Sequence, residues 1–127
     1  MKTIISTPKA PSAIGPYNQA TAFDKLIFTS GQIALDPITM EIVQGGVKEQ
    51  TFQVMENLKA VLEEAGSSFE NVLKTTCYLS DMDNFVAFNE VYGKYFNAET
   101  APARSTVAVK TLPKNVLVEV DTIAFKN

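Results

Sequence analysis

Apolar residues recur at every third or fourth position between residues 51 and 65, and charged residues occupy the positions between them. This spacing places the apolar side chains on one stripe and predicts an amphipathic α-helix with a single buried face. Gly66 follows as a helix stop, because glycine readily adopts the left-handed conformation that ends many helices. The stripe consists of Thr51, Val54, Met55, Leu58, Val61, Leu62 and Ala65.

A second helix is predicted after residue 80, where Ser80 or Asp81 can cap the first turn. Its apolar face is broad and rich in aromatic residues, and the pattern fades at Asn97. This face consists of Phe85, Phe88, Val91, Tyr92, Tyr95 and Phe96.

Short runs of β-branched and aromatic residues predict strands. They cover residues 3–5, 19–23, 26–30, 72–79, 105–110 and 116–125. The polar pair Asp24-Lys25 between two of these runs predicts a hairpin. The strand pattern also continues past Gly31 through Ile33 and Leu35, and a glycine there is typical of a bulge or of a close approach between backbone and ligand.

These elements predict one α+β domain over residues 1–127, with two helices packed on one face of a sheet. The run 116–125 is apolar on both sides, since Val118 and Val120 alternate with Leu117 and Ile123. Two helices can cover only one face, so the other face must be buried by something else. We therefore expect self-association through the sheet.

Composition and charge narrow the range of partners. The net charge is −3, the pI is about 4.9, and the eleven lysines and arginines never cluster. A nucleic-acid surface is usually basic, so no nucleic-acid partner is expected. The chain also lacks an apolar run long enough for a signal peptide or a membrane span, and we expect a cytoplasmic protein.

The chain contains no histidine, which excludes Ser-His-Asp and Cys-His catalysis and removes the commonest zinc ligand. Cys77 is the only cysteine, so no internal disulfide or multi-cysteine metal site exists, and a buried structural thiol is expected. Gly45-Gly46 lacks the rest of any dinucleotide or P-loop motif. Catalysis would depend on carboxylates, hydroxyls, amides, lysine, arginine or the backbone.

Arg104 is the first candidate for such chemistry. It follows Pro102 and Ala103 where a stiff loop enters a strand, among small apolar neighbours. A guanidinium in such surroundings can bind a carboxylate with two parallel hydrogen bonds. The alternative is a structural ion pair with one of the fourteen acidic residues.

Glu119 is the second candidate, a carboxylate between Val118 and Val120 in the most apolar strand. If it is buried, its pKa should rise, and it could then hold a water molecule or transfer protons near neutral pH. The alternative is an exposed glutamate on the outer face, beside Asp121 on the same side of the strand.

Four further polar groups are weaker candidates. Tyr17, after Gly-Pro, could present its phenol to a cleft or could simply pack its ring. Ser30 and Gly31 offer a hydroxyl and an unshielded backbone N–H. Asn89 interrupts the apolar face of the second helix, so its amide is either a satisfied buried group or a ligand contact.

Five spaced motifs, taken together, resemble the reactive intermediate deaminase family (RidA, also called YjgF), and the resemblance runs the whole length of the chain. The motifs are Ala13-Ile14-Gly15-Pro16-Tyr17, Phe28-Thr29-Ser30-Gly31-Gln32, Phe88-Asn89-Glu90-Val91-Tyr92, Pro102-Ala103-Arg104-Ser105, and Leu112-Pro113 with Val118-Glu119-Val120.

The resemblance implies a chorismate-mutase-like fold and a homotrimer with three sites between subunits. It implies hydrolysis of reactive enamines and imines, such as 2-aminoacrylate, to 2-oxo acids and ammonia, with no cofactor and no metal. The alternatives are a non-catalytic sensor of small carboxylates and an RNA-cleaving translation inhibitor.

The resemblance also implies roles for the candidate residues. Arg104 would hold the substrate carboxylate, helped by the backbone around Gly31, and Glu119 would position the attacking water. Tyr17, Ser30 and Asn89 would shape the pocket. Many relatives carry cysteine two residues after the arginine, whereas this chain has Thr106, which can still donate a hydroxyl.

Overall fold

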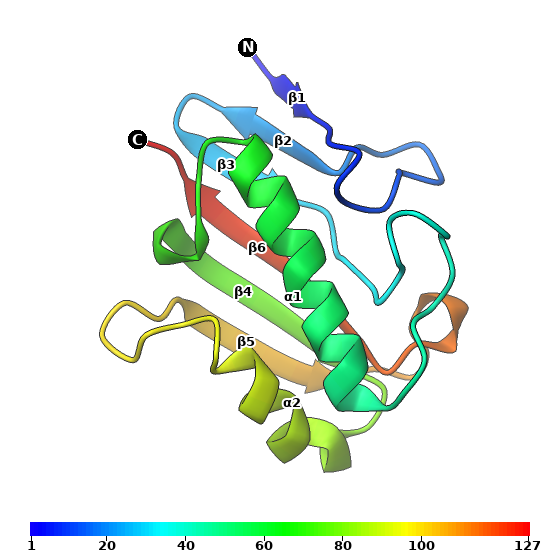
Figure 1. Cartoon of the computed structure of the whole chain (residues 1–127). Coiled ribbons are helices and arrows are strands. Elements are labelled where there is room, and N and C mark those ends of the chain that lie inside the picture. The colour runs from blue at the N-terminus through cyan, green and yellow to red at the C-terminus, as the bar shows by residue number, and fades with distance from the viewer.

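The computed structural model describes residues 1–127, and six strands form one mixed sheet in the order β1-β2-β3-β6-β4-β5 (Figure 1). Only β4 and β5 run parallel to each other, and every other neighbouring pair is antiparallel. The predicted α+β class and the hairpin at Asp24-Lys25 are confirmed. The strands are β1 (Thr3–Ile5), β2 (Ala20–Phe23), β3 (Leu26–Thr29), β4 (Val72–Leu79), β5 (Ala103–Ala108) and β6 (Val118–Phe125).

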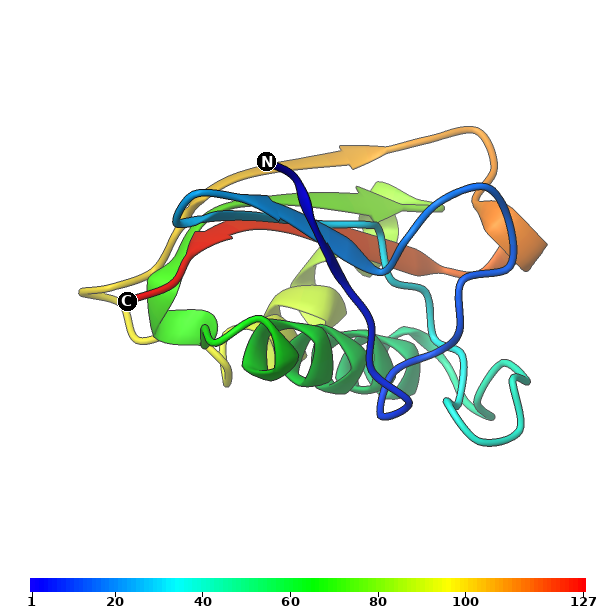
Figure 2. The same cartoon turned by 90° about the horizontal axis from the view of Figure 1, so that it is seen from above.

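Both helices, α1 (Val47–Glu64) and α2 (Phe85–Tyr92), lie on the same face of the sheet (Figure 2). α1 begins before the predicted apolar stripe because its first turn is held by a polar contact. The Glu49 carboxylate accepts a hydrogen bond from the Gly46 N–H at 2.8 Å, which satisfies a donor that the helix leaves free.

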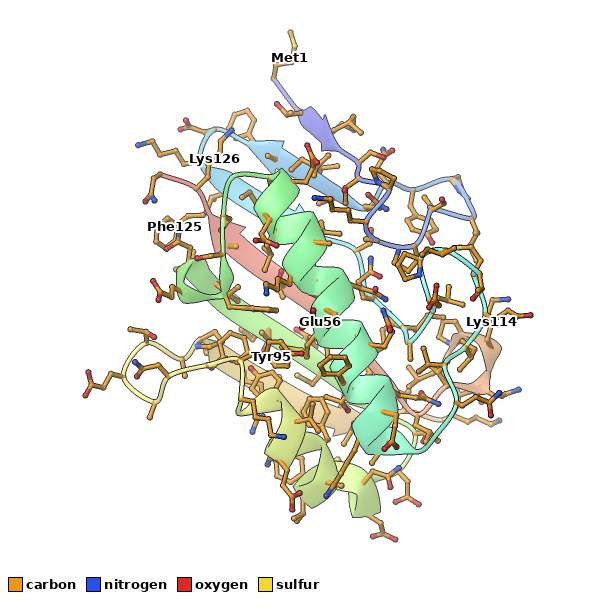
Figure 3. All side chains as sticks on the ribbon, viewed as in Figure 1. Met1, Glu56, Tyr95, Lys114, Phe125 and Lys126 are labelled. Atoms are coloured by element: carbon orange, nitrogen blue, oxygen red, sulfur yellow. The ribbon has the colours of Figure 1, made fainter.

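The second helix is shorter than its apolar pattern predicts. A 3₁₀ turn (Met82–Asn84) precedes it, and the Asp81 carboxylate caps that turn by accepting from the Asp83 N–H. The chain leaves the helix after Tyr92, although Tyr95 still packs on the core. The Tyr95 hydroxyl donates to Glu56 of α1 at 2.7 Å, and Figure 3 shows the two side chains together. This segment therefore remains in the helix layer.

Past Gly31 the chain forms no named strand, but its pairing with β6 resumes one residue out of the β3–β6 register, which is the bulge predicted at this glycine. Only isolated bridges occur there, between Gln32 and Val120 and between Leu35 and Ile42. The carbonyls of Ile33 and Leu35 accept hydrogen bonds from the buried Asn57 amide of α1, at 3.2 and 3.0 Å. These carbonyls are satisfied by the helix and need no partner strand.

Gln19 fixes the loop that precedes β2. Its buried side-chain amide donates to the backbone carbonyls of Thr7, Ala10 and Pro11, and its oxygen accepts from the Thr7 N–H at 2.6 Å. One side chain thus closes the irregular segment 7–19 on itself, which holds Tyr17 in a defined place.

The central strand β6 has two different faces. Val118, Val120, Thr122 and Ala124 lie under the helices and are at most 2% exposed. The alternate residues point to the face that no helix covers, as the period of two in a strand requires.

The uncovered face is apolar at one end. Three side chains there remain more than 40% exposed, and they neighbour the half-buried Ile123 and Phe125 across the sheet. These three are Phe23, Leu26 and Phe28. The other end of the strand carries Glu119 and Asp121. Figure 3 shows Phe125 at the C-terminal end of β6 and Lys114 in the turn before its N-terminal end. The two-sided apolar character predicted for this strand is confirmed for its C-terminal half.

Candidate functional site

Four of the predicted site residues line one cavity of about 430 Å³ beside the beginning of β6. The cavity lies between the loop before β2, the segment after β3 and the turn that precedes β6. We call it the Glu119 cavity. The predicted residues on its wall are Tyr17, Ser30, Gly31 and Glu119.

Gly31 and Glu119 are in close contact on this wall. A Cβ atom at position 31 would overlap the Glu119 carboxylate and lie 2.9 Å from its Cδ, so only glycine fits without displacing that carboxylate. The Gly31 N–H has no hydrogen-bond partner, whereas its neighbours Ser30 and Gln32 both donate to the backbone. The wall thus combines a carboxylate with a free backbone donor.

Tyr17 and Ser30 are tied to the backbone around them. The Tyr17 hydroxyl accepts from the Ile14 N–H at 3.3 Å, and its ring is about half exposed. The Ser30 hydroxyl donates to the Asn18 carbonyl at 2.6 Å. These bonds hold both side chains at the mouth of the cavity, with oxygen lone pairs still able to accept from a ligand.

The carboxylate of Glu119 is partly withdrawn from water. Burial raises the pKa of Glu119 above its ordinary value, and the nearby negative charge of Asp121 raises it further. Burial likewise raises the pKa of Asp121, whose carboxylate accepts from the Tyr78 hydroxyl at 3.4 Å. A carboxyl group with a raised pKa is better suited to exchange protons near neutral pH.

Arg104 lies elsewhere, on the edge strand β5. Its Nη1 donates to Asn89 Oδ1 at 2.7 Å, and its Cζ lies 4.9 Å from the centre of the Tyr92 ring and 5.4 Å from that of Phe85. We call Arg104 and these three side chains of α2 the Arg104 cluster. The single ion pair of the chain joins Lys48 and Glu90, so Arg104 has no acidic partner.

This arrangement decides the alternatives that the sequence left open. Arg104 forms no ion pair within this chain, so the structural ion pair is wrong here. The side-chain oxygen of Asn89 accepts from Arg104 and not from a group of the core. Glu119 is neither fully buried nor fully exposed, and it lies on the face without helices.

Thr106 lies on the same side of β5 as Arg104, two residues further along. Its hydroxyl oxygen is buried and has no hydrogen-bond partner. It is paired in register with Cys77, which is fully buried, and burial raises the pKa of that thiol to about 11. The prediction of a buried thiol is confirmed.

The Glu119 cavity and the Arg104 cluster are separate within one copy of the chain. Arg104 pairs with Thr75 of β4, which pairs with Thr122 of β6, three residues from Glu119. Two strand spacings and three residues place their Cα atoms about 10 Å apart across the sheet and about 10 Å along it. Their side chains also point to opposite faces, so one small molecule cannot touch both.

Several residues that build these groups were not predicted as functional. Lys114 lines the Glu119 cavity from a turn in which its own φ is +55°. Phe85 and Tyr92 were predicted only as part of an apolar helix face. The spacing of Phe85, Asn89 and Tyr92 at i, i+4 and i+7 was the available signal, because it puts all three on one stripe.

A larger hollow of about 640 Å³ lies between α1 and α2, where Phe52 and Val91 form part of its lining. None of the predicted site residues borders it. Its wall also holds Lys48, whose charge is already used in the ion pair with Glu90. All the predicted site residues therefore lie outside this hollow.

Comparison with known proteins decides the family. A family model described as "Endoribonuclease L-PSP" matches residues 7–126. A RutC family protein of Synechocystis is 57% identical over 122 residues, which cover 95% of this chain and 94% of that one. The chain belongs to the RidA/YjgF family. The predicted resemblance is thereby confirmed.

Two further members of the RidA/YjgF family are informative. The mouse 2-iminobutanoate/2-iminopropanoate deaminase is 46% identical over 126 residues, covering 99% of this chain and 93% of its own. The crystal structure of E. coli TdcF with bound serine superposes with a TM-score of 0.92 at 41% identity, over 98% of this chain and 99% of that one. The family thus includes named imine deaminases and a protein that binds a small amino acid.

No helix is both long enough and apolar enough to cross a membrane. No group of three or more histidine, cysteine, aspartate or glutamate side chains is arranged to hold a metal ion.

The raised pKa of Glu119 gives the first prediction. Carbon-detected NMR titration of the side-chain carboxyl should show a midpoint above the ordinary value for glutamate. Asp121→Asn should lower that midpoint, because it removes the neighbouring negative charge. Asp24→Asn, in the β2–β3 turn at the far end of the sheet, should leave the midpoint unchanged. A midpoint at or below the ordinary value would contradict the described environment.

Proposed function

We propose that this chain hydrolyses small 2-imino acids and their enamine tautomers to 2-oxo acids and ammonia, without a cofactor or a metal. The observation that carries the proposal is the free charge of Arg104. An exposed guanidinium held by Asn89 and two aromatic rings, with no acidic partner, is a site for a ligand carboxylate. Membership of a family that includes named imine deaminases supports the same substrate class.

The chemistry needs few groups. The imine carbon is already electrophilic, so the reaction requires a positioned substrate, an activated water and a proton for the leaving nitrogen. Arg104 binds the substrate carboxylate, and the Gly31 N–H donates a further hydrogen bond. Glu119 accepts one proton from the attacking water as the C–O bond forms and passes it to the imine nitrogen, which gives a carbinolamine. It then accepts the proton of the new hydroxyl and passes it to the same nitrogen as the C–N bond breaks, so that C=O forms and ammonia leaves with both protons of the water.

The remaining residues define the pocket. Tyr17 and Ser30 sit at the mouth of the Glu119 cavity and orient the polar atoms of the substrate. Asn89 holds the Arg104 guanidinium, and Thr106 offers its unpartnered hydroxyl to the ligand. A buried hydroxyl without a partner is rare in proteins, and a ligand oxygen would satisfy it.

We further propose that the site forms between neighbouring copies in a homotrimer. Arg104 and Glu119 point to opposite faces of one sheet, so a common substrate requires two chains. The apolar end of the uncovered face, around Phe28 and Ile123, supplies the surface for association. Apolar patches of this kind are typical of protein–protein interfaces.

A second candidate is a non-catalytic sensor that uses the same residues. The structure of TdcF with bound serine favours it, since it is a close relative with a small carboxylate-bearing ligand. A sensor needs Arg104 and Thr106 for binding but has no use for Glu119 as a proton carrier. Both candidates predict that the protein binds a small carboxylate through Arg104, but only the deaminase converts it to product.

The second prediction concerns Arg104. In an assay coupled to a pyridoxal-phosphate-dependent threonine dehydratase, the protein should accelerate release of the 2-oxo acid. Arg104→Ala should reduce this acceleration by at least about a hundredfold, because the lost charge-assisted hydrogen bonds hold the substrate in place. Lys110→Ala, which removes an exposed cation just beyond the same strand, should retain full activity.

An unchanged rate for Arg104→Ala would contradict its assigned role. Absence of turnover in the unmodified protein, together with saturable binding of a 2-oxo acid that Arg104→Ala abolishes, would favour the sensor. Cleavage of RNA at physiological salt would favour the translation inhibitor instead, although the net charge of −3 argues against an RNA surface.

The third prediction concerns assembly. Sedimentation at micromolar concentration should give about three times the chain mass of 13.9 kDa. Phe28→Asp should shift the protein towards the monomer, because it places a charge on the uncovered face. Phe52→Asp, at a similarly exposed phenylalanine of α1, should leave the mass unchanged. A monomeric unmodified protein would refute the intersubunit site.

A further inference from the structure

One stripe of α2 surrounds the guanidinium of Arg104. Phe85, Asn89 and Tyr92 follow one another at i, i+4 and i+7, so their side chains share one face of the helix. Asn89 accepts from Nη1 at 2.7 Å, and the two rings lie 5.4 and 4.9 Å from Cζ. Three different side chains of a short helix therefore converge on one cation.

The two kinds of contact act on different parts of the guanidinium. The five N–H groups lie in its plane, whereas an aromatic ring attracts the cation through the negative charge of its face. Ring contacts hold the group without using its hydrogen-bond donors. Asn89 engages Nη1, and the other donors stay available for a carboxylate.

Tyr92 is itself fixed in position by the strand next to Arg104. Its hydroxyl is 2.8 Å from the Thr75 hydroxyl on β4, and Thr75 is the register partner of Arg104. Its ring also packs against Phe88 and Phe96, at 5.3 and 4.8 Å between centres, and only 7% of the residue is exposed. The Tyr92 ring, the nearer of the two to Arg104, is therefore held in one position by its neighbours.

We propose that Phe85 and Tyr92 are positioning residues that order the Arg104 guanidinium before a ligand binds. This inference rests on the proposed role of Arg104 in carboxylate binding and extends it to how that arginine is presented. Arg104 is exposed on an edge strand, where a free arginine side chain would sample many rotamers. Ordering it in advance lowers the entropy lost on binding and so strengthens affinity.

Binding measurements test the proposal directly. Phe85→Leu and Tyr92→Leu remove a ring face while retaining an apolar side chain. Both should weaken binding of 2-oxobutanoate, measured by calorimetry, by about three- to tenfold. Phe69→Leu is the matched control, because Phe69 is another half-buried ring of the helix side that packs against Tyr95 and Phe96. Its affinity should stay within twofold of the unmodified protein.

A second readout separates positioning from general loss of packing. The Arg104 Nε–Hε resonance, assigned by comparison with Arg104→Ala, should shift in Phe85→Leu as the ring-current contribution disappears, and should stay in place in Phe69→Leu. In the Arg104→Ala background, Phe85→Leu should cause no further loss of affinity. If Tyr92→Leu does not fold, Phe85→Leu alone decides both readouts.

The failures of the two proposals are distinguishable. If Arg104→Ala weakens 2-oxobutanoate binding but Phe85→Leu changes neither the affinity nor the Nε–Hε resonance, the positioning role is overturned and the carboxylate site remains. If Arg104→Ala leaves the affinity unchanged, the carboxylate role of Arg104 fails, and the positioning role fails with it.

Discussion

The alternation of side chains along β6 is the constraint on which the fold and the site both depend. The strand lies between β3 and β4, and its residues alternate between the face under the helices and the face without them. Val118 and Val120 bury themselves completely under α1, and this forces Glu119 onto the opposite face. A shift of one residue in register would exchange the two sets and expose the core.

The same alternation separates the two groups of polar residues. The helix-facing side of β5 directs Arg104 and Thr106 towards α2, where Asn89 and the aromatic rings receive the guanidinium. The Glu119 cavity opens on the uncovered face, next to the free N–H of Gly31. A single copy of the chain thus holds a cation without an anion at one place, and a carboxylate with a raised pKa at another.

The sequence predicted those elements well in which apolar and polar residues alternate with one constant period over the whole element. The stripe of α1 and the alternation of β6 were clear because both buried faces are almost wholly apolar. After Gly31 the periodicity was less regular, because a one-residue bulge precedes the bridge at Gln32 and the buried residues Ala34 and Leu35 belong to a loop. The Asn57 amide, 22 residues further along the chain, donates to the Leu35 carbonyl, and a local pattern cannot predict such a bond.

The sequence predicted which residues are candidates for the site but not how they are arranged in space. The absence of histidine and the placing of Arg104 among small apolar residues singled out the arginine, and the family motifs supplied its companions. Which face each side chain occupies depends on strand register and on the choice of neighbouring strands, which are set by long-range packing. The contact between Arg104 and Asn89, and the overlap of position 31 with Glu119, became visible only in three dimensions.

Subunit complementation tests the central claim that one site combines Arg104 of one copy with Glu119 of another. Arg104→Ala and Glu119→Gln chains, each inactive alone, are mixed in equal amounts, unfolded together and refolded. Random assembly into a cyclic trimer should leave about one site in four with both residues intact, and so restore about a quarter of the deaminase activity. Mixed oligomers that form but stay inactive would contradict a site shared between chains.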